Sequence, residues 1–268
     1  MKIITLFTIT VLIFTTNLSA QNKTPETVFI EAGTYIMGIG ESKYFDEFPA
    51  HKVKVNDFYI GKYEVTIGEF TGFCRTAGLS LPEGDENMPI TNVSWNDAAM
   101  YCNWLSRLNH LDKCYKILRS PKTGRIKITF DKTANGYRLP TEAEWEYVAR
   151  GANKGKHYAY CGSNNPDEVA WYAGTGKMLH PVGEKKANDA GVYDMSGNAQ
   201  EWVYDVYNKD YYKKRVYDYP INDTGGIKRV SRGGSYDSTA EGLRISKRYY
   251  NEPDFKAKNL GFRIAKNK

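Results

Sequence analysis

The chain has 268 residues, with 37 Lys and Arg against 31 Asp and Glu, which gives a formal net charge of +6. We expect this small excess to be spread along the chain, with short clusters such as Lys213-Lys214-Arg215 and Lys185-Lys186. Such clusters are typical of solvated faces and argue against a nucleic-acid-binding protein. The length fits one large domain or two closely joined ones, with a sizeable core.

The N-terminus predicts a cleaved signal peptide over residues 1–20. Met1 and Lys2 give a positive start, residues 3–14 are apolar, and Leu18-Ser19-Ala20 provide a small-residue exit. The apolar run is too short for a spanning helix, which needs about 20 apolar residues. No cysteine comes directly after it, so we do not expect a lipoprotein anchor. Residues 21–268 are therefore predicted to form one exported domain, periplasmic or secreted, without a membrane span.

Two strands are predicted early in the chain. Residues 29–37 and 53–59 are rich in β-branched and aromatic residues that alternate with polar ones. From Gly151 onward, glycines, tyrosines and Asn/Asp pairs dominate, and long periodic runs are few. Short strands and a few helices in a loop-rich chain indicate an α+β domain.

Three helices are predicted between these regions. The first covers residues 66–78 and opens with a capping box, in which Thr66 is followed by Glu69. The second begins after Ser94, because apolar residues then recur at helical spacing. The third covers residues 141–151 and opens with the same kind of box.

The segment 191–202 combines glycines with carboxylates. Gly191 and Gly197 permit tight bends that turn carbonyl oxygens inward, while Asp194 and Glu201 supply carboxylates. Calcium binds carboxylate and carbonyl oxygens together. An acidic surface turn without a metal explains the same residues, so both interpretations stand on the sequence.

Four motifs in this order resemble the sulfatase-modifying-factor family, whose founding activity is formylglycine generation. They are Val93-Ser94-Trp95-Asn96-Asp97-Ala98-Ala99, Tyr137-Arg138-Leu139-Pro140-Thr141-Glu142-Ala143-Glu144-Trp145-Glu146, the segment 191–202, and Arg232-Gly233-Gly234-Ser235-Tyr236 with Asn259-Leu260-Gly261-Phe262-Arg263. The match covers residues 29–265. It implies an α+β, C-type-lectin-like FGE-sulfatase fold that is loop-rich, with little regular secondary structure and a few short helices.

The resemblance also implies a metal site in the acidic loop. The calcium ligands of the family fall on Asp194, Gly197, Ala199 and Glu201, with the glycine and alanine contributing carbonyl oxygens. A second calcium site of the family needs a longer segment before this loop than residues 171–181 provide. We therefore expect one calcium ion.

The oxidase chemistry of the family is not expected here. Formylglycine-generating members hold copper between two cysteines after the Gly-Gly-Ser motif, and cuprous copper prefers thiolates. Ser238 occupies the first cysteine position, no cysteine follows Cys161, and Gln200 stands where the family commonly has tryptophan. We predict no copper and assign no catalytic residue. Iron is not expected either, because the four histidines lack the paired spacing of iron-dependent members: His51, His110, His157 and His180.

The cysteines fit no metal-binding spacing, and four of them allow three disulfide pairings. The family pairs a cysteine at the position of Cys102 with one just after the final Gly-Phe-Arg, where this chain has Ile264. We therefore expect Cys102 to be a buried free thiol, and leave the pairing of the others open.

What remains is a polar, aromatic groove that corresponds by resemblance to the peptide cleft of the oxidase. The residues expected to bind a ligand there are Ser235, Tyr236, Arg244, Arg248 and Asn259. Ser235 and Asn259 have an alternative role in holding backbone, and Arg232 and Arg263 are expected to be structural. Two functions follow: a non-catalytic pseudoenzyme that binds a peptide, glycan or protein, or a protein-modifying oxidase of formylglycine-generating type with a different metal site.

Overall fold

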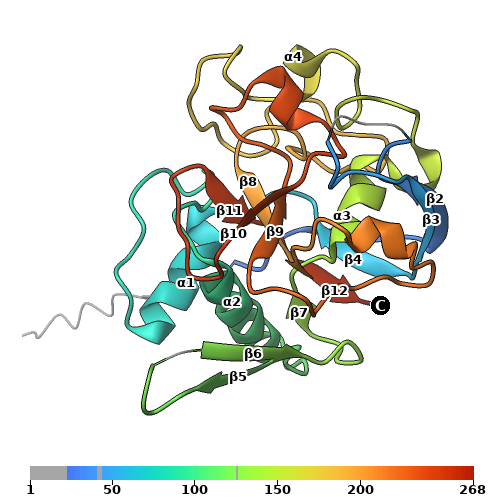
Figure 1. The fold of residues 1–268 in the computed structure, drawn as a ribbon. Helices are drawn as coiled ribbons and strands as arrows, with labels where there is room; N and C mark the ends of the chain where they lie inside the picture. Colours follow the sequence, from blue (N-terminus) through green and yellow to red (C-terminus); the bar gives the residue numbers. More distant parts are fainter. Residues whose placement is uncertain (1–22, 41–43, 125) are drawn as a thin grey trace, which may run out of the picture.

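The computed structural model describes residues 23–40, 44–124 and 126–268, so the predicted signal peptide lies outside the described residues. Short strands and helices are joined by long loops (Figure 1). None of the helices in the described part of the chain is long and apolar enough to span a membrane. In chain order the α-helices and strands are β1 (Thr27–Ile30), β2 (Gly33–Met37), β3 (His51–Val55), β4 (Phe58–Gly61), α1 (Ile67–Ala77), α2 (Trp95–Leu108), β5 (Tyr115–Arg119), β6 (Ile126–Phe130), β7 (Tyr137–Arg138), α3 (Glu142–Ala149), α4 (Pro166–Val169), β8 (Gln200–Val206), β9 (Arg229–Arg232), β10 (Tyr249–Asn251), β11 (Leu260–Phe262) and β12 (Ala265–Asn267).

Two four-stranded sheets form the centre of the described structure. One has the order β1-β4-β12-β7, and the other has the order β10-β9-β8-β11. The C-terminal strand β12 pairs with both β4 and β7, which joins the two ends of the domain. In the second sheet β8 pairs with β9 antiparallel and with β11 in parallel, so the acidic loop before β8 lies beside the segments before β11 and after β9.

Each predicted early strand is divided in two. Residues 29–37 form the end of β1 and all of β2, and residues 53–59 are shared by β3 and β4, with the two halves in different sheets. The division occurs at a shared corner, where the Ala32 N–H donates to Asp57 Oδ1 at 2.7 Å. Periodicity did not show this corner because the residues on both sides of it favour strands.

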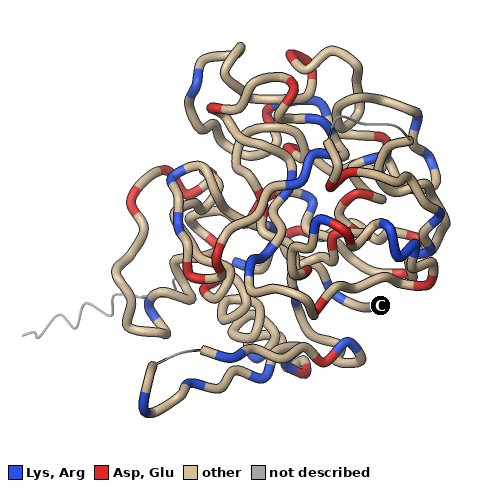
Figure 2. The backbone as a smooth tube through the Cα atoms, in the orientation of Figure 1, with Lys and Arg blue, Asp and Glu red and all other residues tan. Residues whose placement is uncertain are grey.

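The three predicted helices are confirmed. α1 has the capping box of Thr66 and Glu69 and ends at Gly78, which adopts φ 66°. α2 follows Ser94 and α3 follows Thr141, and in each case the side chain of the preceding residue caps the first turn of the helix. The hairpin of β5 and β6 was not predicted. It lies at the lower edge of Figure 1, and Figure 2 shows basic residues along it.

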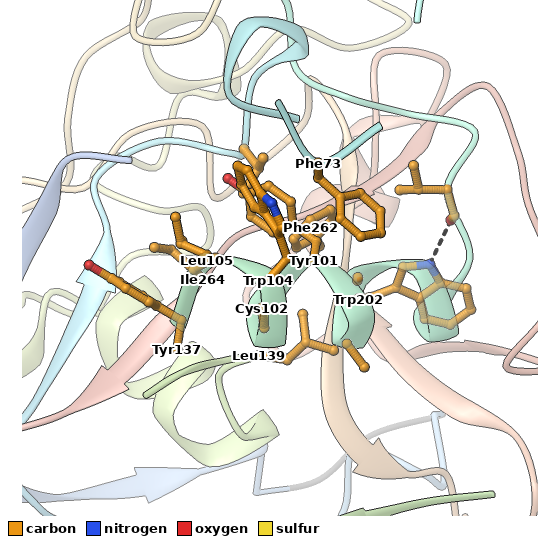
Figure 3. Close-up of a cluster of buried hydrophobic side chains, with 14 of the residues drawn as sticks. Phe73, Tyr101, Cys102, Trp104, Leu105, Tyr137, Leu139, Trp202, Phe262 and Ile264 are labelled. Atoms are coloured by element: carbon orange, nitrogen blue, oxygen red, sulfur yellow. Dashed lines mark hydrogen bonds between the residues drawn. The ribbon is translucent and has the colours of Figure 1, made fainter. Parts of the chain in front are cut away.

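Aromatic side chains fill the core between α1, α2 and the second sheet (Figure 3). Trp202 on β8 is fully buried and donates to the Val93 carbonyl at 3.0 Å. Cys102 lies in the same cluster and is a buried free thiol, as predicted. The other three cysteines are also free and buried.

Helix α3 is buried along its whole length and is surrounded by ion pairs. Its three glutamates meet arginines. Arg138 comes from β7 just before the helix, whereas Arg232 and Arg248 come from distant segments and hold the loops of the C-terminal half onto the helix. The pairs are Arg138 with Glu144 (2.6 Å), Arg232 with Glu146 (2.5 Å) and Arg248 with Glu142 (2.7 Å). The structural role predicted for Arg232 is confirmed.

Candidate functional site

A glycine turn after β9 begins the candidate ligand face. Gly233 and Gly234 have φ of 89° and 69°, a region that favours glycine. A Cβ on Gly234 would lie 2.8 Å from the Gly242 carbonyl oxygen. The turn places Ser235 beside Asn259, the residue that precedes β11.

Ser235 and Asn259 belong to one polar cluster with Asp237. The Ser235 hydroxyl donates to Asp237 Oδ1 at 2.6 Å, and Asn259 Nδ2 donates to the same carboxylate oxygen at 3.0 Å. Ser238 Oγ accepts from the Ser235 N–H at 3.0 Å. Ser235 itself is buried, whereas Asp237 is exposed and Tyr236 is half-buried. The groups that this cluster offers to a ligand are therefore Tyr236, Asp237 and Asn259.

The two predicted arginines lie in different surroundings. Arg244 is half-buried and both of its terminal nitrogens donate to Glu47, at 2.7 and 3.0 Å. Arg248 is only 2% exposed and donates to both oxygens of Glu142. The prediction that Arg248 lines an open groove is corrected, because its guanidinium is buried and its donors are satisfied inside the protein.

A pocket of about 240 Å³ adjoins Arg244. Lys247 Nζ lies 5.1 Å from the centre of the Tyr44 ring and 5.4 Å from that of Tyr249, so the ammonium is held between two aromatic faces. The sequence did not indicate Tyr44 or Lys247 as site residues, since Tyr44 comes from a turn-rich segment about 200 positions earlier. The pocket is lined by Tyr44, Thr239, Glu241, Gly242, Arg244, Lys247 and Tyr249.

The acidic loop is tightly enclosed. Gly197 has φ 84°, and a Cβ there would lie 2.2 Å from the Trp171 carbonyl oxygen, so only glycine fits. Asp194 and Asn198 also have positive φ, at 58° and 54°. Glu64 holds this conformation by accepting from the Ala199 N–H at 2.7 Å and from Asn198 Nδ2 at 2.9 Å. The sequence analysis missed Glu64, which lies 135 positions before Ala199.

The loop concentrates buried negative charge. Glu64, Asp194 and Glu201 are all buried, and the cation among them is Arg263, which donates to both oxygens of Glu201 at 2.7 and 2.6 Å. Burial raises the pKa of Asp194 to about 6. Burial and the neighbouring Asp194 and Glu201 carboxylates raise the pKa of Glu64 well above its usual range. The structural role expected for Arg263 is confirmed.

The oxygen atoms of this loop are only partly engaged by the protein. The carbonyl oxygens of Gly197 and Ala199 accept no hydrogen bond from the described residues. Asp194 uses one carboxylate oxygen to accept from the Gly183 N–H at 2.7 Å. Glu201 is engaged by Arg263, so a cation would share it. Among the described residues, no three His, Cys, Asp or Glu side chains are grouped so that they could hold a metal ion, and a calcium ion here would therefore depend on backbone carbonyls.

The thiols are all removed from solvent. Burial raises the pKa of Cys161 to about 12 and that of Cys114 to about 11. It also raises the pKa of Cys74, and raises that of Cys102 well above its usual range. Soft-metal ligands and nucleophiles act as thiolates, so these cysteines are inert at neutral pH.

Comparisons with known proteins identify the family and the fold. The FGE-sulfatase family, described as the sulfatase-modifying factor enzyme 1-like domain, matches residues 15–268. The chain belongs to this family. Its α+β fold is the FGE-sulfatase fold, shared with the solved structure of Treponema denticola variable protein 1 at a TM-score of 0.76 and 27% identity, covering 90% of this chain and 95% of that one.

The relatives of this FGE-sulfatase member are named for different activities. The chain is 37% identical to chaperone protein LppX of Paenibacillus barcinonensis, across 82% of this chain and 81% of that protein. It is 27% identical to the formylglycine-generating enzyme of Streptomyces coelicolor, across 89% of this chain and 88% of the enzyme. A Chlamydia trachomatis protein named serine/threonine-protein kinase Pkn1 is 26% identical, and the chain spans 38% of its length.

Proposed function

We propose that this chain is an exported, non-catalytic FGE-sulfatase member that binds a peptide, glycan or protein partner. The observation that carries the proposal is the hydrogen bonding of Ser238, the residue at the position of the first copper-binding cysteine of the family. Its hydroxyl accepts from the Ser235 N–H and so closes a turn of the backbone. A hydroxyl is a poor ligand for cuprous copper, and no cysteine follows Cys161 in the chain.

A second departure from the family pattern, Gln200 in place of tryptophan, supports the same conclusion. Gln200 lies at the start of β8, is 8% exposed, and its amide donates to Ser231 Oγ at 2.5 Å. The side chain that replaces the family tryptophan is thus tied into the sheet. It offers a substrate no aromatic surface, and its amide nitrogen is already engaged.

The ligand face has the composition of a recognition surface. Tyr236, Asp237 and Asn259 offer a phenol, a carboxylate and an amide, and the adjoining pocket adds Tyr249 and the ammonium of Lys247. Tyrosines combine contact area with directed hydrogen bonds and are favoured at the centre of interfaces. This face suits a ligand that carries both hydrogen-bonding groups and an anion, such as a peptide with an acidic side chain or a charged glycan.

Calcium belongs to the proposal as a structural ion. Asp194 and Glu201 would hold it through carboxylates, and Gly197 and Ala199 through carbonyls. A bound divalent cation would offset the negative charge that Glu64 and Asp194 bring into the interior. Because the Tyr236 N–H donates to the Asn198 carbonyl at 2.8 Å, ordering this loop would also order the ligand face.

The catalytic alternative is tested by mass spectrometry. A peptide with the sulfatase-type Cys-x-Pro-x-Arg motif is incubated with the protein, oxygen, a reductant and copper, and cysteine conversion to the aldehyde is measured. A formylglycine-generating enzyme that has both cysteines is the positive control. We expect no conversion. Turnover that survives removal of contaminating enzyme would overturn the proposal and require a new metal site.

Binding is tested on arrays of peptides and of glycans. We expect selective retention of a subset of ligands by the native protein, with loss of that retention in Tyr249→Ala and Lys247→Glu. Lys186→Glu is the matched control, because Lys186 is exposed and lies outside the pocket. Equal retention by all of these proteins would show that this face is not the binding site.

A further inference from the structure

The net charge of the chain is concentrated in one segment. Residues 107–132 contain eight Lys and Arg and two Asp, an excess of +6 that equals the net charge of the whole protein. The remaining residues are therefore neutral in sum. This corrects the expectation that the excess is spread along the chain. The basic residues are Arg107, Lys113, Lys116, Arg119, Lys122, Arg125, Lys127 and Lys132.

This segment runs from the end of α2 through the hairpin of β5 and β6, which projects below the body in Figure 1 and carries the blue residues at the bottom of Figure 2. In the described part of the segment, none of its basic side chains forms an ion pair. These side chains are exposed, and their charges therefore face solvent without a carboxylate partner among the described residues.

The outer edge of β5 is open. Asn103 caps the first residue of the strand: Asn103 Nδ2 donates to the Tyr115 carbonyl at 2.7 Å, and the Tyr115 N–H donates to Asn103 Oδ1 at 3.1 Å. In an antiparallel pair, the N–H and C=O of alternate residues point to the same side. Ile117 and Arg119 therefore point their backbone groups in the same direction as Tyr115, away from β6. No described residue continues the ladder that Asn103 begins.

A pocket of about 170 Å³ lies beside this edge, between β5, α1 and α2. Its floor is apolar and includes Phe73 and Trp104, both of which belong to the core in Figure 3. Arg107 and Lys113 are exposed and form a cationic rim. The complete lining is Phe73, Thr76, Ala77, Met100, Asn103, Trp104, Arg107, Lys113 and Ile117.

We propose that β5 and this pocket bind an extended acidic segment of a partner protein, which adds to β5 as a third strand. Main-chain hydrogen bonds to Ile117 and Arg119 would provide affinity, as in other cases of strand addition. One apolar side chain of the partner enters the pocket, and carboxylates on its neighbours meet Arg107 and Lys113. Lysines on an edge strand also discourage self-association. That protective role does not require an apolar pocket beside the edge.

The charge contribution is tested with the full chain and a fluorescein-labelled peptide of alternating glutamate and valine. We expect saturable binding by fluorescence anisotropy that weakens as salt is added. Combining Arg107→Glu with Lys113→Glu should weaken binding by about tenfold or more, whereas the exposed control Lys186→Glu should bind normally. Both altered side chains are exposed, so circular dichroism should show a native fold. No binding of the acidic peptide by the native protein would overturn the proposal.

The backbone contribution is tested by a matched pair, Arg119→Pro and Arg119→Ala. Both remove the charge, but only proline removes the outward N–H, and that N–H is not needed for pairing with β6. Arg119→Pro should therefore bind about fivefold more weakly than Arg119→Ala. Equal affinities would show that the peptide is held by charge alone and would overturn strand addition. Binding to phosphatidylglycerol vesicles without binding to the peptide would identify a membrane surface instead, which also overturns the proposal.

Discussion

Replacing Glu142 by glutamine should strongly destabilise the domain. Glu142 accepts two hydrogen bonds from Arg248, at 2.7 and 2.8 Å, and one from Arg232 at 3.1 Å. Arg232 keeps Glu146, but Arg248 forms no ion pair with another carboxylate of the described residues, and its side chain is 0% exposed. Breaking a buried ion pair by removing one partner costs about 3–5 kcal/mol, because the remaining charge stays buried.

This loss is a large part of the stability of a typical domain, about 5–15 kcal/mol. Thermal and urea denaturation of Glu142→Gln should show it, with Tm lowered on the order of 10 °C. Glu86→Gln is the matched control, because Glu86 is 70% exposed in its pair with Lys23, and the cost there should be below about 1 kcal/mol. Adding Arg248→Met to Glu142→Gln should cost less than the sum of the single changes. A loss near 1 kcal/mol for Glu142→Gln, or strict additivity, would refute the reasoning.

Three further changes test other parts of the structure. Calcium should raise the Tm of the native protein but not of Asp194→Ala or Glu201→Ala; the same calcium response in all three would remove the metal site. Burial raises the pKa of Asp205 to about 7, so the folded chain keeps a proton that the unfolded chain releases near its ordinary pKa of about 4. Asp205 therefore lowers the free energy of unfolding as pH rises from about 4 to 7, by up to about 4 kcal/mol, and urea denaturation of Asp205→Asn across this range should show a flatter dependence. Gly234→Ala places a Cβ 2.8 Å from the Gly242 carbonyl oxygen in a backbone region that disfavours alanine, and we expect a loss of about 1–3 kcal/mol by denaturation; an unchanged midpoint would show that the turn relaxes freely.

Local signals predicted the helices well. The capping boxes at Thr66 and Thr141 are short-range patterns, and each is present with both of its hydrogen bonds. The left-handed end of α1 at Gly78 follows from glycine alone. Such features depend on residues three or four positions apart, which is the range in which a sequence can be interpreted without a fold.

The candidate site could be predicted only in part. The motifs pointed to the segments that hold Ser235, Asn259 and the acidic loop, and the structure adds that Asn259 Nδ2 donates to the Ser235 hydroxyl at 3.3 Å. They did not show that Glu64 supports the loop or that Arg248 is buried against Glu142, because these contacts join segments more than 100 positions apart. The charge on the hairpin was visible in the sequence, but its importance depends on the open edge of β5, which only the fold reveals.

The ion pairs of α3 also have a consequence for the evolution and engineering of this face. Arg232 and Arg248 anchor the two ends of the segment that lies between them in the sequence. Arg232 additionally donates to the carbonyls of Ile245 and Ser246. Residues 236–241 between these anchors are exposed or half-buried. Apart from Asp237 and Ser238, whose side chains hold the turn, their identities are therefore largely independent of the forces that keep the domain folded. The same frame can carry many different recognition surfaces, and a library randomised at the other positions of this short stretch should retain the fold while varying the ligand.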